Sequence, residues 1–204
     1  MNICFCIDSM SPNSSNELGD YLFDNLNPII IDNRPVIFLC IGTDRSTGDS
    51  LGPLIGYKIK GLSGNKIYIY GSLESPVHAK NLQEIITKIY KTFKNPFLIA
   101  IDSSLGSVHN IGKVIIEDTP LVPGSALKKN LPSIGDICIK GIVNISTNFD
   151  FMILQNTRLY TVMELADCIS DGIKHFIFKV NRTFYNADSN FLNIKKICTK
   201  HISF

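Results

Sequence analysis

Two aspartates follow buried, strand-like segments, and they are the residues of this chain best placed for acid–base chemistry. Asp49 closes a polar loop behind the apolar run 36–41, and Asp102 directly follows the apolar run 97–101. Ligands of open α/β sheets bind at the carboxyl ends of the strands, so both carboxyl groups are expected in one crevice. Two close carboxyl groups cannot both ionise easily, and a shared proton gives one acid and one base. Such a pair is the minimum needed to activate water against an amide bond.

Each aspartate also has a simpler interpretation. Asp49 precedes a helical stripe and is a good N-cap residue. Asp102 is typical of a turn at a strand end, where its carboxylate bonds the amide of Ser103 or Ser104. Asp44, in the same loop as Asp49, is expected to be solvated. The pattern alone leaves the catalytic and the purely structural interpretations open.

Other kinds of site find little support. The spacing of Gly42 and Gly48 does not fit G-x-G-x-x-G, and Asp49 stands where a phosphate-binding loop needs Lys. No G-x-S-x-G elbow occurs, although His78 and His109 fall in loops that could reach the crevice. The six cysteines form no C-x-x-C pair and no Cys/His metal pattern. The sequence therefore predicts no nucleotide, no metal and no other cofactor.

The elements that must position the aspartates alternate along the chain. Apolar runs predict strands at residues 36–41, 66–70, 96–101, 113–117 and 137–145. Stripes at helical spacing predict helices at residues 50–60, 81–93 and 157–178. This alternation is typical of a three-layer α/β sandwich with a mostly parallel sheet. Residues 34–204 are expected to form a single α/β peptidase-like domain, preceded by an N-terminal arm at 1–33 with a short helix near 17–25.

The composition argues against nucleic acid and membranes as partners. The chain has 204 residues and a net charge of +2, so no strong field points to nucleic acid or to an anionic membrane. Its apolar runs are strand-sized and too short to span a bilayer. We expect no signal peptide, and we expect reduced thiols in a cytoplasmic protein.

The loop around Asp49 carries a recognisable motif. Residues 40–53 read C-I-G-T-D-R-S-T-G-D-S-L-G-P, which resembles the signature of the sporulation protein YyaC family. The stretches 100–106, 123–125, 141–145 and 156–159 resemble that family too, so the likeness covers about residues 35–175. The family is similar to the germination protease of endospore formers, an atypical aspartic-type protease that degrades small acid-soluble spore proteins. It is more distantly similar to nickel-hydrogenase maturation endopeptidases. The resemblance implies a phosphorylase/hydrolase-like α/β sandwich.

The resemblance also assigns roles to the two aspartates. Asp49, in D-S-L-G-P, matches one catalytic aspartate of the germination protease, and Asp102, in I-D-S-S-L, matches the other, with Ser103 replacing an Ala. Residues 131–136 contain no His where the hydrogenase maturation enzymes carry a nickel ligand. A metal-dependent site therefore lacks one ligand.

Further residues of the first loop are expected to support the pair. Arg45 and the backbone amides of Ser50 and Leu51, at a helix start, are candidates to stabilise an oxyanion. Three glycines are expected to shape the loop, namely Gly42, Gly48 and Gly52.

The sequence as a whole predicts a spore-associated endopeptidase of aspartic type. Its substrate would be a protein or peptide, with small spore proteins as candidates, in the cytoplasm of the sporulating cell or forespore. A homo-oligomer is compatible with the sequence. Two alternatives remain: a non-catalytic sporulation protein that keeps the peptidase fold, and a metal-dependent maturation peptidase with nickel or zinc held by Asp49, Asp102 and His78.

Overall fold

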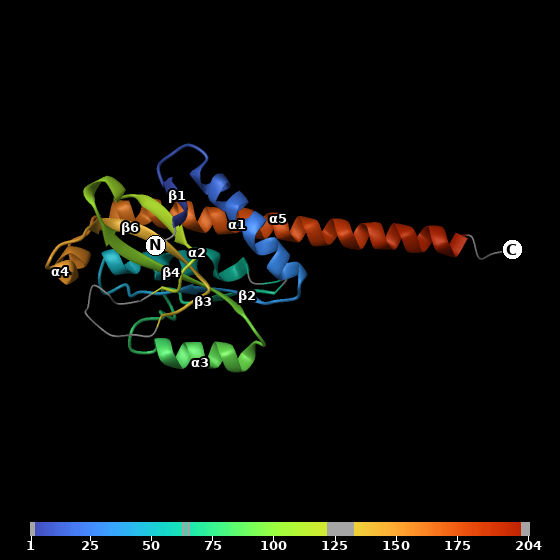
Figure 1. Cartoon of the computed structure of the whole chain (residues 1–204), viewed down its shortest axis with the longest axis horizontal. Helices are drawn as coiled ribbons and strands as arrows, with labels where there is room; N and C mark the ends of the chain where they lie inside the picture. Colours follow the sequence, from blue (N-terminus) through green and yellow to red (C-terminus); the bar gives the residue numbers. More distant parts are fainter. Residues whose placement is uncertain (1–2, 63, 65, 122–132, 201–204) are drawn as a thin grey trace.

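A six-stranded mixed sheet forms the middle layer of the molecule (Figure 1). The computed structural model describes residues 3–62, 64, 66–121 and 133–200. The strand order is β1-β5-β6-β4-β2-β3. The pairs β2–β3, β2–β4 and β4–β6 are parallel, and β1–β5 and β5–β6 are antiparallel. The strands are β1 (Ile3–Asp8), β2 (Val36–Cys40), β3 (Ile67–Tyr70), β4 (Phe97–Gly106), β5 (Lys113–Glu117) and β6 (Ile137–Ile145).

Helices cover both faces of this sheet, which confirms the predicted α/β class. One face carries α1 (Ser14–Ile31), α2 (Leu51–Ile59) and α5 (Leu159–Lys200), and α3 (Leu82–Thr92) lies on the other (Figure 1). The short helix α4 (Asp150–Gln155) follows β6. Single 3₁₀ turns complete the chain: η1 (Gly48–Ser50), η2 (Lys60–Leu62) and η3 (Val108–Asn110).

The central strands are buried on both faces, which explains their unbroken apolar runs. In β4, Ile99 and Ile101 pack in the larger core with α1, α2 and α5, while Leu98 and Ala100 pack in the smaller core under α3. All five residues of β2 are buried. This alternation places the side chain of Asp102, the next residue, toward the α3 side of the sheet.

Residues 1–33 were predicted to form an N-terminal arm, but the described part of this segment contributes the strand β1 to the sheet and the helix α1 to the core. β1 pairs antiparallel with β5. The first helix is also longer than expected, and Leu18, Leu22, Leu26 and Ile30 are fully or almost fully buried in the same core as α5. A four-residue spacing puts these side chains on one face of α1, where they pack against the C-terminal helix.

Two other elements extend beyond their predicted ends. β4 continues to Gly106, so Asp102 lies within a strand and not after it. α5 continues to Lys200, well past the expected end at 178 (Figure 1). The predicted motif at 123–125 lies outside the described residues.

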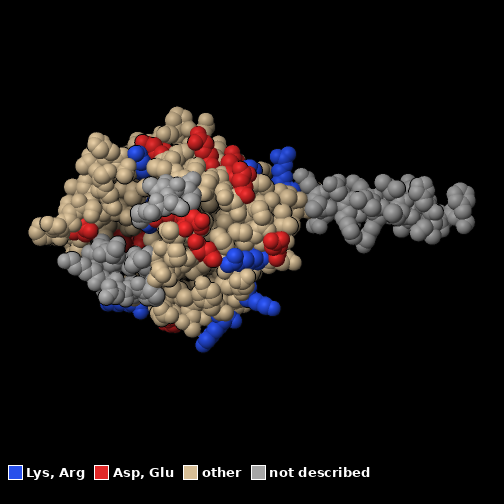
Figure 2. All heavy atoms as spheres, in the orientation of Figure 1, with Lys and Arg blue, Asp and Glu red and all other residues tan. Residues whose placement is uncertain are grey.

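One face of the molecule carries charged side chains of both signs (Figure 2). On the face in Figure 2, basic and acidic side chains are interspersed among uncharged ones. Within the described residues, every helix is too short or too polar to cross a membrane.

Candidate active site

The two aspartates lie where the chain direction reverses across the sheet. From β2 the chain passes through α2 to β3 at one edge, whereas from β4 it continues to β5 and β6 on the other side. The neighbouring parallel strands β2 and β4 thus form a topological switch point, which is where open α/β sheets bind ligands. Asp49 follows β2, and Asp102 comes one residue after Ile101, the register partner of Cys40.

Backbone hydrogen bonds hold both aspartates at this edge. The N–H of Ile41, just past β2, donates to the carbonyl of Ile101 at 2.7 Å. The N–H of Thr43 then donates to the carbonyl of Asp49 at 2.9 Å, which folds the loop back on the strand end. As a result, the charge of Asp49 acts on Asp102 and raises its pKa. The expectation that both carboxyl groups share one edge of the sheet agrees with this arrangement.

Burial is the largest cause of the raised pKa values of Asp49 and Asp102. Asp102 is 8% exposed, and burial raises its pKa well above the ordinary value, with the charge of Asp49 as the second cause. The N–H of Ser103, 2.8 Å from Oδ1 of Asp102, and Lys140 act in the opposite direction. Burial also raises the pKa of Asp49 to about 6, against a lowering by the Thr43 N–H. Burial is therefore the first cause of the raised pKa in both groups, and repulsion by Asp49 adds to it at Asp102.

The structure contradicts the purely structural interpretation of Asp49 and agrees in part with that of Asp102. Asp49 is not a helix N-cap: it lies inside η1, and Ser50 precedes α2 without a side-chain cap. Asp102 does bond the Ser103 amide, but in a strand that continues to Gly106. Asp44 is exposed, as expected of a solvated loop residue.

Glycines allow the loop to press against the strand end. Gly42 has a φ of +140°, and a Cβ there would lie 2.1 Å from the carbonyl oxygen of Asp49. A Cβ on Gly52 would lie 2.0 Å from the carbonyl oxygen of Ile41, so α2 starts in direct contact with the end of β2. Gly48 packs against α4: a Cβ on Gly48 would lie 2.8 Å from Cδ2 of Leu154. The geometry explains why this loop carries glycine at these positions.

The expected oxyanion donors are only partly available. The hydroxyl and the N–H of Ser50 both donate to the carbonyl of Thr47, at 2.7 and 3.2 Å, so Ser50 is excluded from this role. Leu51 is fully buried in the core. Arg45 is exposed, and its N–H bonds Oγ1 of Thr43 at 3.3 Å. The Arg45 guanidinium and the Leu51 N–H stay candidates.

The structure adds a buried ion pair that sequence reasoning missed. Lys140 of β6 is the register partner of Asp102, and its Nζ lies 2.7 Å from Oε2 of Glu117 on β5. The two side chains are only 17% and 5% exposed. A lysine inside the apolar run 137–145 was the available signal, because a buried charge needs a partner. The positive charge of Lys140 lowers the pKa of Asp102, against the effect of burial.

The structure does not build the three-ligand metal site of the alternative hypothesis. Among the described residues, no three His, Cys, Asp or Glu side chains come together to hold a metal ion. His78 follows Val77, which pairs with Ile41 beyond the end of β2. Its Nδ1 is buried without a hydrogen-bond partner, so His78 stands near this edge without joining the aspartates as a ligand.

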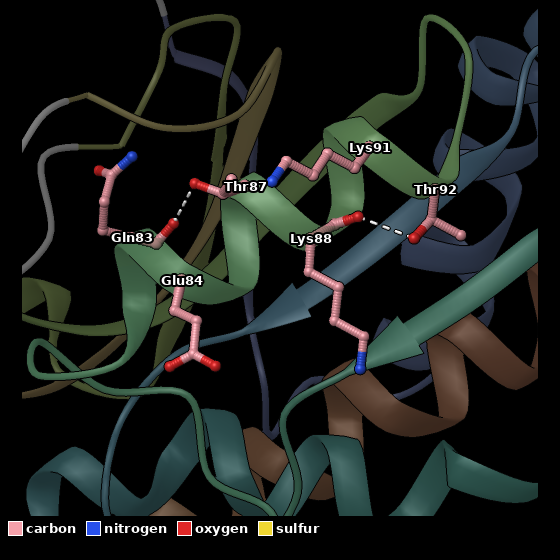
Figure 3. Close-up of a pocket in the computed structure, with 6 residues that line it drawn as sticks. All are labelled: Gln83, Glu84, Thr87, Lys88, Lys91 and Thr92. Atoms are coloured by element: carbon pink, nitrogen blue, oxygen red, sulfur yellow. Dashed lines mark hydrogen bonds between the residues drawn. The ribbon is translucent and has the colours of Figure 1, made fainter.

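A surface hollow on α3 is unrelated to the aspartates (Figure 3). It is lined by one helix alone, and its threonines bond that helix: Thr87 donates to the carbonyl of Gln83 at 2.7 Å, and Thr92 to that of Lys88 at 2.8 Å. Its polar groups therefore do not converge on a bound molecule. The lining residues are Gln83, Glu84, Thr87, Lys88, Lys91 and Thr92.

Comparison with known proteins places the chain in a family. It is 49% identical over 140 residues to a Bacillus subtilis (strain 168) protein described as uncharacterized protein YyaC, covering 69% of this chain and 68% of that protein. A solved structure, the [NiFe] hydrogenase maturation protease HycI from Thermococcus kodakarensis KOD1, matches with a TM-score of 0.39 and 16% identity, over 69% of this chain and 92% of that one. A family model matches residues 6–172, and the chain belongs to that family, described as a protein of unknown function (DUF1256).

Proposed function

We propose that this protein is a peptidase of aspartic type that uses Asp49 and Asp102 as its acid–base pair. One observation carries the proposal: two carboxyl groups at a topological switch point have pKa values raised by burial, and the charge of one raises the pKa of the other. Perturbed carboxyl pairs in a crevice are typical of catalytic sites. The resemblance of D-S-L-G-P and I-D-S-S-L to the germination protease supports the same pair.

The two groups divide the chemistry by their proton affinity. With a pKa of about 6, Asp49 is ionised at neutral pH and is the base, and Asp102 is the acid. Water attacks the scissile carbonyl carbon while its proton passes to Asp49 and the proton of Asp102 passes to the carbonyl oxygen. The C–N bond of the resulting gem-diol then breaks as Asp49 returns its proton to the leaving amine. A diol hydroxyl reprotonates Asp102, so both groups regain their starting states.

The substrate and setting follow from the resemblance. We propose protein substrates, with small acid-soluble spore proteins as first candidates, in the cytoplasm of a sporulating cell or forespore. The substrate and the cellular setting are parts of the proposal, and either can be disproved without disproving the acid–base pair.

The test is incubation of the purified protein with small acid-soluble spore proteins, followed by mass spectrometry of the fragments. Asp49→Asn and Asp102→Asn should each abolish cleavage, because each removes a proton acceptor or donor while keeping the side-chain shape. Asp44→Asn is the matched control, since it removes an exposed carboxylate from the same loop and should leave cleavage unchanged.

Two outcomes would favour the alternatives. Absence of cleavage by the wild-type protein over a wide range of substrates and pH supports a non-catalytic protein. Cleavage that a chelator abolishes, with an equivalent of nickel or zinc in the purified protein, supports the metal-dependent peptidase.

A further inference from the structure

A lysine lies beside Asp102 on the same face of the sheet. Lys140 of β6 is the register partner of Asp102 of β4, and these two strands are parallel. Register partners on neighbouring strands point to the same face, and such strands are about 4.8 Å apart. The residues two positions earlier agree with this, because Ala100 and Cys138 are also register partners and both pack in the smaller core under α3. The side chains of Lys140 and Asp102 are therefore neighbours across the two strands.

Glu117 holds Lys140 from the next strand, β5. Oε2 of Glu117 accepts from Nζ of Lys140 at 2.7 Å, from Oγ1 of Thr119 at 3.4 Å and from Sγ of Cys138 at 3.9 Å. Burial raises the pKa of the Cys138 thiol, so this third donor is uncharged. Glu117 is only 3% exposed. Three donors thus fix a buried carboxylate, and this carboxylate fixes the ammonium group of Lys140.

Stability alone is a weak explanation for this ion pair. Replacing a buried ion pair with apolar residues of similar volume is often neutral or stabilising, because two charges no longer have to leave water. The group that needs a positive charge here is Asp102, which becomes a buried anion when it donates its proton in the proposed reaction. Of the two charges that act on Asp102 in the described structure, that of Asp49 opposes this anion and that of Lys140 favours it.

We infer that Lys140 is a positioning residue of the proposed reaction, whose ammonium group, held by Glu117, stabilises the anion that Asp102 becomes on donating its proton. In that step the O–H bond of Asp102 breaks, the proton passes to the substrate carbonyl oxygen, and the electron pair stays on the carboxylate. Lys140 acts through Asp102 and transfers no proton. Glu117 balances part of the charge of Lys140, so Asp102 keeps its proton in the resting state. This inference rests on the proposed function and deepens it at the acid.

Two variants with opposite expected effects test the inference. Glu117→Gln leaves the charge of Lys140 unbalanced, so the pKa of Asp102 should fall. Lys140→Met with Glu117→Gln removes both charges at similar volume, so the pKa of Asp102 should rise. A ¹³C NMR titration of the carboxyl groups measures both shifts. The alkaline limb of the pH profile for cleavage of small acid-soluble spore proteins should move in the same two directions, because the acid must be protonated. The double variant should cleave at least about tenfold more slowly, the effect of one neighbouring charge on proton release.

Arg34→Met is the matched control, because it breaks an ion pair at the opposite end of β4 and β6. Nη2 of Arg34 lies 3.2 Å from Oδ1 of Asp136, the residue before β6, and the variant should leave the pKa of Asp102 and the pH profile unchanged. No shift, or shifts of the same sign in both test variants, overturns the inference. Each test variant has its own expected sign, so either one decides if the other fails to fold. The expected NMR shifts without cleavage by the wild-type protein would contradict the proposed function alone, since the titration needs no turnover.

Discussion

Replacing Asp49 with Asn should stabilise the folded protein at neutral pH. Burial raises the pKa of Asp49 from its ordinary 3.8 to about 6, so the folded state binds this proton more tightly than the unfolded chain does. The stability that the proton contributes is present below pH 3.8 and is lost as the pH rises toward 6. At about 1.36 kcal/mol for each pKa unit, the loss amounts to about 3 kcal/mol. Asn keeps the shape of the side chain and carries no charge to bury.

The assay is urea unfolding followed by circular dichroism between about pH 3.5 and 7.5, a range that spans both pKa values of Asp49. Other carboxyl groups titrate over the same range, so the quantity to follow is the difference in unfolding free energy between Asp49→Asn and the wild type. This difference should grow by up to about 3 kcal/mol in favour of the variant as the pH rises. Asp44→Asn, in the exposed part of the same loop, should show no such trend.

A flat difference across this range would refute the reasoning, since Asp49 would then ionise as readily in the folded protein as in the unfolded chain. A variant that is less stable than the wild type at neutral pH would show instead that the carboxylate makes a stabilising contact. Either result would also remove the physical basis for Asp49 as a base with a raised pKa.

Three further predictions test other parts of the site. Asp102→Asn should leave the pKa of Asp49 near 6 in a ¹³C NMR titration, because burial and not repulsion raises it; a fall toward the ordinary value would mean that repulsion dominates. Glu117→Ala should cost about 3 kcal/mol or more in urea unfolding, because Lys140 is left buried without its partner, and adding Lys140→Met should recover part of the loss. Gly52→Ala should cost about 3 kcal/mol or more by the same measurement, since its Cβ would collide with a backbone carbonyl, and a neutral result would show that α2 can shift away.

The local signals in the sequence were sufficient to locate the strands of the sheet other than β1. β5 and β6 have the predicted bounds, and β2, β3 and α3 differ from theirs by a residue or so at their ends. These elements can be predicted from sequence because a strand buried on both faces gives an unbroken apolar run, and a helix buried on one face gives an apolar stripe at helical spacing. Asp102 was singled out because the apolar run stops at Ile101, although β4 itself continues to Gly106.

What the sequence did not predict depends on contacts between distant segments. β1 is a strand because β5, far along the chain, pairs with it, and nothing within residues 3–8 indicates that partner. The partner of Lys140 lies on another strand, so the lysine could be noticed but its ion pair could not be assigned. The hydrogen bonds that occupy Ser50 depend on the exact geometry of η1, which the motif does not specify.

The packing of α1 on α5 has a consequence for synthesis on the ribosome. α1 is synthesised well before α5, the helix that buries Leu18, Leu22 and Leu26, which begins only at Leu159. At ordinary rates of translation this leaves the apolar stripe of α1 uncovered for on the order of ten seconds. β1 likewise has no pairing strand until β5 has emerged from the ribosome. The native core between α1 and α5 therefore closes only when α5 has emerged from the ribosome.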